Sequence, residues 1–473
     1  MPNDDKLPTV MPRPHDQPEK KSGWTALLAA AESLTWARNR DGTPFVKFGG
    51  FWYPITSNVA QGWLAKKQIE LNVMANNAPD RISKIMGAKL RDTTPLDFSL
   101  RMGHAKEAVF LDLGHEDGSI IVVDAAGWRV TQTAPVHFVR SSGMRALPLP
   151  MPGGDIRDLL RHINLQGKDL PLVAGWLLAL FMPPAPYPLL ILNGEQGSAK
   201  TTTARLLRSL VDPHETDLRP PFKSEDQLRA MMGQSLIIAF DNLSGITPAQ
   251  SDILCRLSTG TVIGSRKLYT DGDEYTVRAM KPVLINGISD LVARADLASR
   301  AIVLHLPRIP DGQRRTIEDI TKCFEAAHPM LLGVLLDGVS MALRELRHLG
   351  PLQLPRMADF ALWCTAAETA LGWQRGAILQ AFNENQREAE REILDNDPIA
   401  PAIHDLLTKE GNFQGTQADL HRKLDQLIVS CPVKVGALSK HLRRSAPNLR
   451  GAGIDIEWKR VGGGTRIIVI RKR

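Results

Sequence analysis

A glycine-rich turn near the middle of the chain carries a lysine and a threonine at the spacing of a phosphate-binding loop. Residues 188–203 read PLLILNGEQGSAKTTT, an apolar run followed by a turn and the start of a helix. Gly194 and Gly197 let the backbone bend so that its N–H groups point at phosphate oxygens, and the helix N-terminus adds positive charge. Lys200 would then reach the β- and γ-phosphates, and the Thr201 hydroxyl would bind Mg²⁺.

Ala199 departs from the consensus for such loops, which has glycine before the lysine. Alanine is the smallest replacement and is compatible with the start of a helix, so we expect the loop to close. The alternative is an ordinary strand–turn–helix with a chance Lys-Thr pair, but the flanking strand and helix favour an ATP site with Mg²⁺ as cofactor. The predicted nucleotide-binding residues are Gly194, Gly197, Ser198, Ala199, Lys200, Thr201 and Thr202.

Two later apolar strands end in polar residues that could share this site. Residues 235–242 read SLIIAFDN, and Asp241 at the end of the run could hold Mg²⁺ directly or through water. Residues 282–287 read PVLING, so Asn286 could position the attacking water or touch the γ-phosphate. We therefore predict a catalytic group that includes Lys200, Asp241, Asn242 and Asn286, with Thr201 and Asp241 as the metal ligands.

The general base is open at this stage. Asn242 stands where many related ATPases have a glutamate, and an amide can orient a water molecule but cannot take its proton. Glu225 and Asp252 are candidates only because they are acids nearby in the sequence.

Arg300 precedes another apolar strand, in the segment LASRAIVLHL over residues 297–306. This position suits a guanidinium presented to the nucleotide of a neighbouring subunit, where it would offset charge on the transferred phosphoryl group. Arg294 is a rival for that role, and Arg356 could reach the nucleotide from the start of a later helix. A structural ion pair is the alternative for Arg300 and Arg356.

A basic hairpin is predicted between the strands that end in Asp241 and Asn286. Residues 267–277 read KLYTDGDEYTV, and Asp-Gly between alternating residues favours a two-residue turn. Its positive charges could meet nucleic-acid phosphates and its ring could stack on a base, although an ordinary surface hairpin is the alternative. The residues concerned are Arg266, Lys267 and Tyr269.

The totals indicate a soluble protein of two to four domains: 473 residues, 43% hydrophobic and 23% charged. The four cysteines lie far apart and lack metal-ligand spacing, and no signal peptide is visible. The longest apolar run, residues 170–182, is too short to cross a bilayer. We expect a cytoplasmic protein without a membrane partner.

The chain as a whole is predicted to be α/β, with composition shifts that mark its parts. Five prolines lie among charged residues at the N-terminus, a β-rich stretch ends before a proline-rich linker, and a long helical region follows the nucleotide site. The predicted parts are a disordered tail (1–22), an α+β N-terminal domain (23–150), an ATPase core (151–310), a helical lid (311–395) and a DNA-binding domain (396–473).

The positive charge of the chain is concentrated in its last part. The whole chain has a net charge of +7, and residues 401–473 hold 14 Lys/Arg against 6 Asp/Glu, so all of the excess lies there. Three helices followed by a basic two-stranded wing form a winged-helix pattern, in which the third helix enters a major groove and the wing meets phosphates. The predicted DNA contacts are Lys440, Arg443 and Arg444 on the helix, and Lys459, Arg460 and Arg466 on the wing.

The order of these features resembles the superfamily 3 helicases of viruses, phages and plasmids, which are AAA+ ATPases that usually work as hexameric rings. Residues 298–300 (ASR) are similar to the Leu-Ser-Arg finger of minichromosome-maintenance-type helicases. The likeness is strongest to phage and mobile-element replication ATPases, often fused to or encoded beside a primase. It rests on residues 252–260 (DILCRLSTG), residues 266–271 (RKLYTD) and the C-terminal part, and covers about residues 105–473.

This resemblance implies an AAA+ core with a lid and a winged helix. It implies that Lys200 and Thr201 bind nucleotide and metal, that Asp241 binds Mg²⁺ and that Asn286 is sensor 1. Arg300 would be the finger in trans, and Lys267 the base of the pore hairpin that grasps single-stranded DNA. The implied partners are single-stranded and forked DNA, further copies in a hexamer, and a primase or other replication protein.

The predicted function is therefore an ATP-dependent DNA helicase or translocase for replication of a phage or mobile element. One alternative is an origin-binding initiator or loader that uses ATP to assemble and does not unwind, which Asn242 keeps open. Another is a DNA-binding regulatory ATPase. The N-terminal third shows no primase catalytic acids, so no nucleotide polymerisation is predicted.

Overall fold

The structure is a computed structural model that describes residues 23–266, 274–287, 291, 294–428, 431–461 and 464–473. The described residues divide into two compact units, with the boundary between Asp97 and Phe98. The predicted N-terminal domain, residues 23–150, therefore contributes to both units, and the predicted tail, residues 1–22, lies outside the described residues.

The first unit is a small α+β domain with its own core. Its strands form an antiparallel meander in which β2 pairs with both β1 and β3. Leu27, Val46, Leu64 and Ile82 are fully or almost fully buried between the helices and this sheet. Its elements are α1 (Gly23–Glu32), β1 (Trp36–Arg38), β2 (Pro44–Phe48), β3 (Phe51–Pro54), α2 (Asn58–Glu70) and α3 (Ala78–Lys89).

The second unit begins with a four-stranded antiparallel meander. The strands β5 (Met102–Ala105), β6 (Ala108–Asp112), β7 (Ile120–Asp124) and β8 (Gly127–Thr131) pair in sequence order. β4 (Phe98–Leu100), before the meander in the chain, pairs in parallel with β9 (His137–Val139), which follows the meander. The meander packs on α9 (Ile317–Glu345), so it belongs to the same hydrophobic core as the rest of the unit.

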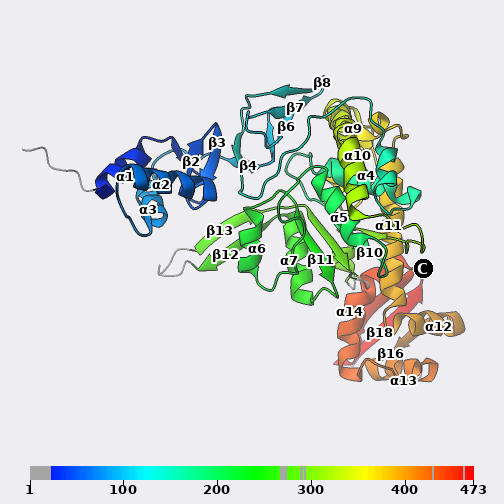
Figure 1. Cartoon of the computed structure of the whole chain (residues 1–473). Coiled ribbons are helices and arrows are strands. Elements are labelled where there is room, and N and C mark those ends of the chain that lie inside the picture. The colour runs from blue at the N-terminus through cyan, green and yellow to red at the C-terminus, as the bar shows by residue number, and fades with distance from the viewer. Residues whose placement is uncertain (1–22, 267–273, 288–290, 292–293, 429–430, 462–463) are drawn as a thin grey trace, which may run out of the picture. The chain divides into compact units, whose positions relative to one another are not determined.

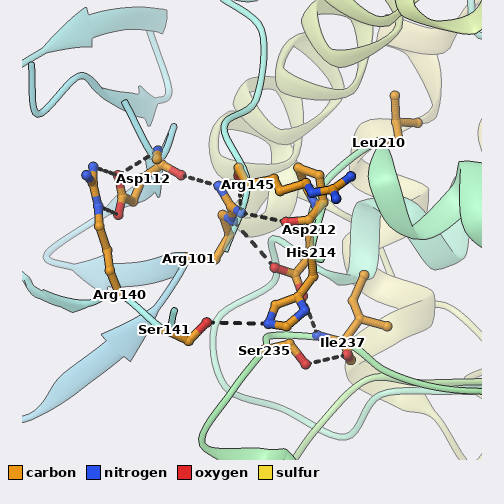
Figure 2. A network of polar contacts seen from close by, with 12 residues as sticks. Arg101, Asp112, Arg140, Ser141, Arg145, Leu210, Asp212, His214, Ser235 and Ile237 are labelled. Carbon is orange, nitrogen blue, oxygen red and sulfur yellow. Dashed lines mark hydrogen bonds and ion pairs between the residues drawn. The ribbon is translucent and has the colours of Figure 1, made fainter. Parts of the chain in front are cut away.

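A buried polar network joins this meander to the segment that follows α5 (Lys200–Ser209) (Figure 2). Arg101 is 1% exposed, and its guanidinium donates to the carbonyls of Arg145 at 2.6 Å and Pro213 at 3.0 Å. It also pairs with the Asp212 carboxylate at 3.4 Å. The other oxygen of Asp212 accepts the backbone N–H of Ile237 at 2.9 Å. One guanidinium and one carboxylate thus hold four segments of the chain together.

A four-stranded parallel sheet lies at the centre of the second unit (Figure 1). Its strands are β10 (Leu189–Asn193), β11 (Ile238–Leu243), β14 (Val283–Gly287) and β15 (Ala301–His305), in the spatial order β11-β14-β10-β15. Both faces are covered: Leu190 and Leu192 face the core shared with α4 (Leu170–Ala179), α5 and α9. Leu189 and Ile191 face a second core under α7 (Pro248–Thr259). This two-sided burial explains the continuous apolar runs.

Helices and short connections surround this sheet. In the described part of the chain, one helical stretch, Ile317–His348, is long and apolar enough to cross a membrane, but 61% of its most apolar window is buried inside the protein, as expected of a core helix. The remaining elements are η1 (Ile156–Arg161), η2 (Gly167–Asp169), α6 (Glu225–Met232), α8 (Ala295–Ala298), η3 (Leu346–His348), α10 (Ala358–Ala367), η4 (Glu368–Leu371) and α11 (Ala377–Asp395).

β12 (Thr261–Arg266) and β13 (Glu274–Ala279) form a two-stranded antiparallel ribbon beside α6 (Figure 1). The predicted hairpin over 267–277 is therefore longer at its base than expected. Lys267 and Tyr269 lie outside the described residues, and only the backbone of Arg266 is described.

The last part of the chain has a separate hydrophobic core, which contains Ile403, Leu420, Leu442 and Ile470. Three helices pack on a three-stranded antiparallel sheet in the order β16-β18-β17. The predicted third helix, 435–445, extends six residues further than expected. The elements are α12 (Ala400–Glu410), β16 (Asn412–Gly415), α13 (Gln417–Leu427), α14 (Val435–Gly451), β17 (Ile454–Arg460) and β18 (Arg466–Lys472).

Candidate nucleotide-binding site

The glycine-rich loop leaves the carboxyl end of β10 and leads into the N-terminus of α5. Gly194 has φ +154°, and a Cβ atom there would lie 2.7 Å from the carbonyl oxygen of Leu306. Gly197 has φ +86°, in the region that favours glycine. Both glycines are therefore required by the backbone path, which turns the loop around the start of the helix.

Ala199 does not begin the helix as expected. It is the residue before the helix, with φ 57° and ψ 28°, in the left-handed conformation. This conformation explains why the consensus has glycine here, because it costs a residue with a Cβ atom about 1–2 kcal/mol. The loop closes around alanine, but at a cost in free energy.

Lys200 is 9% exposed and its ammonium points back into the loop. Nζ donates to the carbonyl oxygens of Gly194 and Glu195, both at 2.7 Å, and to Ser198 Oγ at 3.3 Å. Burial lowers the pKa of Lys200 below its usual value, and the negative charge of Asp241 opposes this shift. The ammonium is thus enclosed by the same loop whose N–H groups would receive phosphates.

Thr201 and Asp241 are in direct contact, with Thr201 Oγ1 donating to Asp241 Oδ1 at 2.9 Å. Adjacent oxygen ligands of an octahedral Mg²⁺ ion also lie about 2.9 Å apart, because each is about 2.0 Å from the ion. The two side chains therefore have the chemistry and the spacing of two neighbouring magnesium ligands.

Asn286 lies between these groups and is 1% exposed. β14 pairs with β10 on one side and with β11 on the other, so its end falls between the loop and Asp241. Asn286 Oδ1 accepts the backbone N–H of Asn242 at 2.8 Å, and Asn242 has the left-handed φ of 57°. The amide nitrogen of Asn286 has no hydrogen-bond partner among the described residues. A buried donor left free is available to a ligand.

Two residues that the sequence analysis missed touch the loop from outside. Asn164 Nδ2 donates to the carbonyls of Ser198 at 3.0 Å and Pro307 at 2.6 Å. A Cβ atom added to Gly197 would lie 3.4 Å from Arg314 Nη2, so this guanidinium is next to the loop. Nothing in the sequence singles out Asn164, whereas the Arg-Arg pair at 314–315 after the last strand was a usable signal.

Arg300 lies at the amino ends of the parallel strands, whereas the loop lies at their carboxyl ends. β10 and β15 run parallel with Leu189 opposite Ala301, so Arg300 precedes the strand at its amino end. A five-residue strand spans about 15 Å, which separates this guanidinium from the loop of its own chain. The side chain is 12% exposed and pairs with Asp296, while its Nε has no partner within the described structure.

The other candidate acids and arginines gather on the Arg300 side. Glu225 pairs with Arg256 at 2.5 Å and Asp252 pairs with Arg294 at 2.6 Å. Glu225, Asp252 and Arg300 line one cavity of about 480 Å³. Arg356 pairs with Asp296 at 3.2 Å, and a neighbouring cavity of about 840 Å³ is lined by Arg294, Arg356 and residues of α14.

Two family models match the sequence. Residues 156–386 match the Actinomycete integrative conjugative element (AICE) replication protein, RepA, and residues 399–473 match the AICE RepA C-terminal domain. Each segment is thus similar to a part of the AICE RepA replication proteins of mobile elements. The predicted link to replication of mobile elements is thereby confirmed, and membership of superfamily 3 stays a prediction. No curated protein matches the chain.

Solved structures align along most of the chain with low scores. One is described as "SCCmec type IV Cch - active helicase": it is 12% identical, has a TM-score of 0.45, and the alignment covers 91% of this chain and 90% of that one. Another is the apo C-terminal region of NrS-1, at 10% identity and a TM-score of 0.41, with coverage of 97% and 100%. We infer nothing about function from similarity at this level.

The C-terminal part of the chain presents its predicted DNA-binding residues to solvent. Lys440, Lys459, Arg460 and Arg466 are exposed. Arg443 is exposed as well, and its guanidinium stacks on the Trp458 ring with 4.4 Å to the ring centroid, which joins the helix α14 to the wing strand β17. Arg444 is exposed too, but it also lines the 840 Å³ cavity beside Arg294, on the side of α14 that faces the rest of the second unit.

Proposed function

We propose that this protein is an ATP-dependent DNA helicase or translocase that acts in the replication of a mobile element. The observation that carries the proposal is the contact between Thr201 and Asp241 beside the Lys200 loop, with the free amide of Asn286 next to it. Lys200, the oxygens of Thr201 and Asp241, and the buried amide of Asn286 all lie at the carboxyl ends of three neighbouring strands.

The chemistry is that of phosphoryl transfer from ATP to water. Lys200 would leave the loop carbonyls for the β- and γ-phosphates, since the phosphate charge is a stronger acceptor for its ammonium. Asn286 would donate to a γ-phosphate oxygen, and Arg314 offers a second cation from outside the loop. When bound at Thr201 and Asp241, Mg²⁺ would neutralise charge on the β- and γ-phosphate oxygens.

The position of Arg300 favours a site shared between two copies of the chain. Its guanidinium is a strand length away from the loop of its own subunit, so it would serve the nucleotide of a neighbour. Release from Asp296 would free it for that contact. Glu225 and Asp252, the candidate bases, line the same cavity as Arg300. They would therefore approach the ATP of the neighbouring subunit, which fits the lack of a base at Asn242.

The AAA+ assignment rests on the strand order, in which the Asn286 strand separates the loop strand from the Asp241 strand. The winged-helix assignment rests on three helices and a basic wing around one core. We propose that the wing and α14 bind duplex DNA, that the β12–β13 ribbon meets a single strand in a hexameric ring, and that the protein works in the cytoplasm with a primase or other replication protein.

The proposal is tested by measuring ATP hydrolysis and strand displacement on forked DNA for the native chain and for Lys200→Ala. We expect both activities to be lost, since the loop keeps its backbone but loses its charge. Lys322→Ala, at an exposed position on α9, is the matched control and should keep both activities. If hydrolysis and displacement survive in Lys200→Ala, the proposed function is wrong.

One observation favours a second candidate, an ATP-dependent initiator or loader that does not unwind. Asn242 is exposed and cannot act as a base, and the carboxylates of Glu225 and Asp252 are engaged by arginines. Slow hydrolysis that supports DNA-dependent assembly, with no strand displacement at any ATP concentration, would favour this candidate over the helicase.

A further inference from the structure

Three side chains of different chemistry meet at the C-terminal end of α13. His421 and Asp425 lie one helical turn apart, and Cys431 lies in the connection to α14. One ligand atom from each, the imidazole nitrogen, a carboxylate oxygen and the sulfur, lies within 4.8 Å of the other two. His421 Nδ1 and Asp425 Oδ2 are 3.2 Å apart.

Local structure explains why these three groups converge. Residues four apart share one face of a helix, which puts His421 and Asp425 side by side. The backbone N–H of Cys431 donates to Asp425 Oδ1 at 2.6 Å, and this bond holds Cys431 beside the end of the helix. The second oxygen, Oδ2, is the one that faces His421. The Asp425 carboxylate is therefore fixed through Oδ1 by the backbone, while its Oδ2 is directed at His421.

We propose that His421, Asp425 and Cys431 bind one divalent metal ion of the zinc type. Imidazole nitrogen, thiolate sulfur and carboxylate oxygen are the ligands that Zn²⁺ takes in proteins, whereas Mg²⁺ and Ca²⁺ prefer oxygen alone. A water molecule would complete a tetrahedron. Binding replaces the thiol proton of Cys431 with the metal and releases that proton to solvent.

The ligand atoms, which lie within 4.8 Å of one another, would have to approach by up to about 1.5 Å to bind one zinc ion. Ligand atoms about 2.0–2.3 Å from a tetrahedral zinc ion lie about 3.3–3.8 Å from one another. The His421–Asp425 pair is already at 3.2 Å, so the movement falls on the sulfur. Cys431 is 9% exposed, and its sulfur lies 3.6 Å from the carbonyl oxygen of Val433, a weak contact that a metal–thiolate bond would replace.

A metal here would fasten the connection between α13 and α14. Residues close to the proposed site, Leu427, Ile428 and Val433, are only partly buried. The ion would be bonded to Cys431 and to two side chains of α13. These bonds would hold Cys431, which precedes α14, against the end of α13. The effect is on the stability of the C-terminal domain and does not depend on any ATP chemistry.

The experiment uses the full chain, purified without a metal-binding tag, stripped with a chelator and titrated with Zn²⁺ or with Co²⁺ as a spectroscopic probe. We expect one equivalent of zinc per chain, a rise in the melting temperature on adding zinc, and a thiolate-to-cobalt charge-transfer band. Cys431→Ser should lose the band, while Cys323→Ser should keep it, because Cys323 is an exposed cysteine on α9.

His421→Asn is the second variant and keeps the thiol, so it covers the case in which Cys431→Ser fails to fold. We expect its zinc affinity to fall at least about tenfold. The proposal is overturned if the native chain shows no charge-transfer band, if the band persists unchanged in Cys431→Ser, or if zinc leaves the melting temperature unmoved. The three side chains would then be a helix-surface ion pair beside a packed thiol.

Discussion

At the scale of single residues, Ala199 is under backbone strain in the loop that would hold the phosphates. Its left-handed conformation costs an L-residue about 1–2 kcal/mol, and glycine would remove that cost while adding about 0.5–1 kcal/mol of unfolded-state entropy. We expect Ala199→Gly to raise the free energy of unfolding by about 0.5–1 kcal/mol in a urea titration. Ala249→Gly, at an exposed helical position in α7, should lower it instead.

His328 makes the stability of the protein sensitive to acid. It is buried, its Nε2 lies 3.0 Å from the carbonyl oxygen of Leu210, and burial lowers its pKa to about 4. Because this pKa is below the unfolded value of about 6.5, the stabilising contribution is complete above pH 6.5 and declines as the pH falls towards 4.

We expect this single group to remove about 2 kcal/mol from the free energy of unfolding between pH 7 and pH 5. His328→Gln keeps a donor for the Leu210 carbonyl and does not titrate in this range. Urea titrations at several pH values should therefore give a flatter profile for His328→Gln than for the native chain.

At the scale of elements, α14 presents its predicted DNA contacts in two directions. Arg443 stacks on Trp458 of the wing, whereas Arg444 lines the cavity shared with Arg294 and Arg356. Adjacent residues on a helix point about 100° apart, so one arginine can face a duplex while its neighbour faces the rest of the protein.

This difference gives a prediction for duplex binding. Arg443→Ala should weaken binding and reduce the slope of log K against log salt by about one, as expected for one lost phosphate contact. Arg444→Ala should change the duplex affinity and its salt slope far less. Equal losses in the two variants, measured by salt-dependent anisotropy titrations, would mean that both arginines face the DNA.

At the scale of the whole molecule, we proposed a site shared by two copies because Lys200 and Arg300 lie at opposite ends of the parallel strands. Lys200→Ala and Arg300→Ala should each abolish ATP hydrolysis. Mixed at equal amounts, they should regain part of the activity, because some junctions then combine an intact loop from one chain with an intact arginine from the next. Hydrolysis rates of the mixture against the two separate variants measure this. A mixture as inactive as its components would contradict a shared site.

The sequence by itself predicted the buried strands and the glycine-rich loop, and it indicated a role in the replication of a mobile element. Apolar runs without alternation indicated buried parallel strands, with Asp241 and Asn286 near the ends of two of them and Lys200 at the start of the helix after the third. These features could be predicted because each is carried by residues that are neighbours in the sequence. The basic C-terminal domain followed from charge and helix spacing.

Only the tertiary structure decided which side chains meet. The left-handed Ala199, the contact of Asn164 with the loop and the convergence of His421 with Cys431 each depend on backbone angles or on distant segments that pattern does not encode. The same holds for Arg101 and Asp212, which are 111 residues apart in the chain. Spacing reports which residues share a helix face or a strand end, whereas packing between elements sets the distances on which chemistry depends.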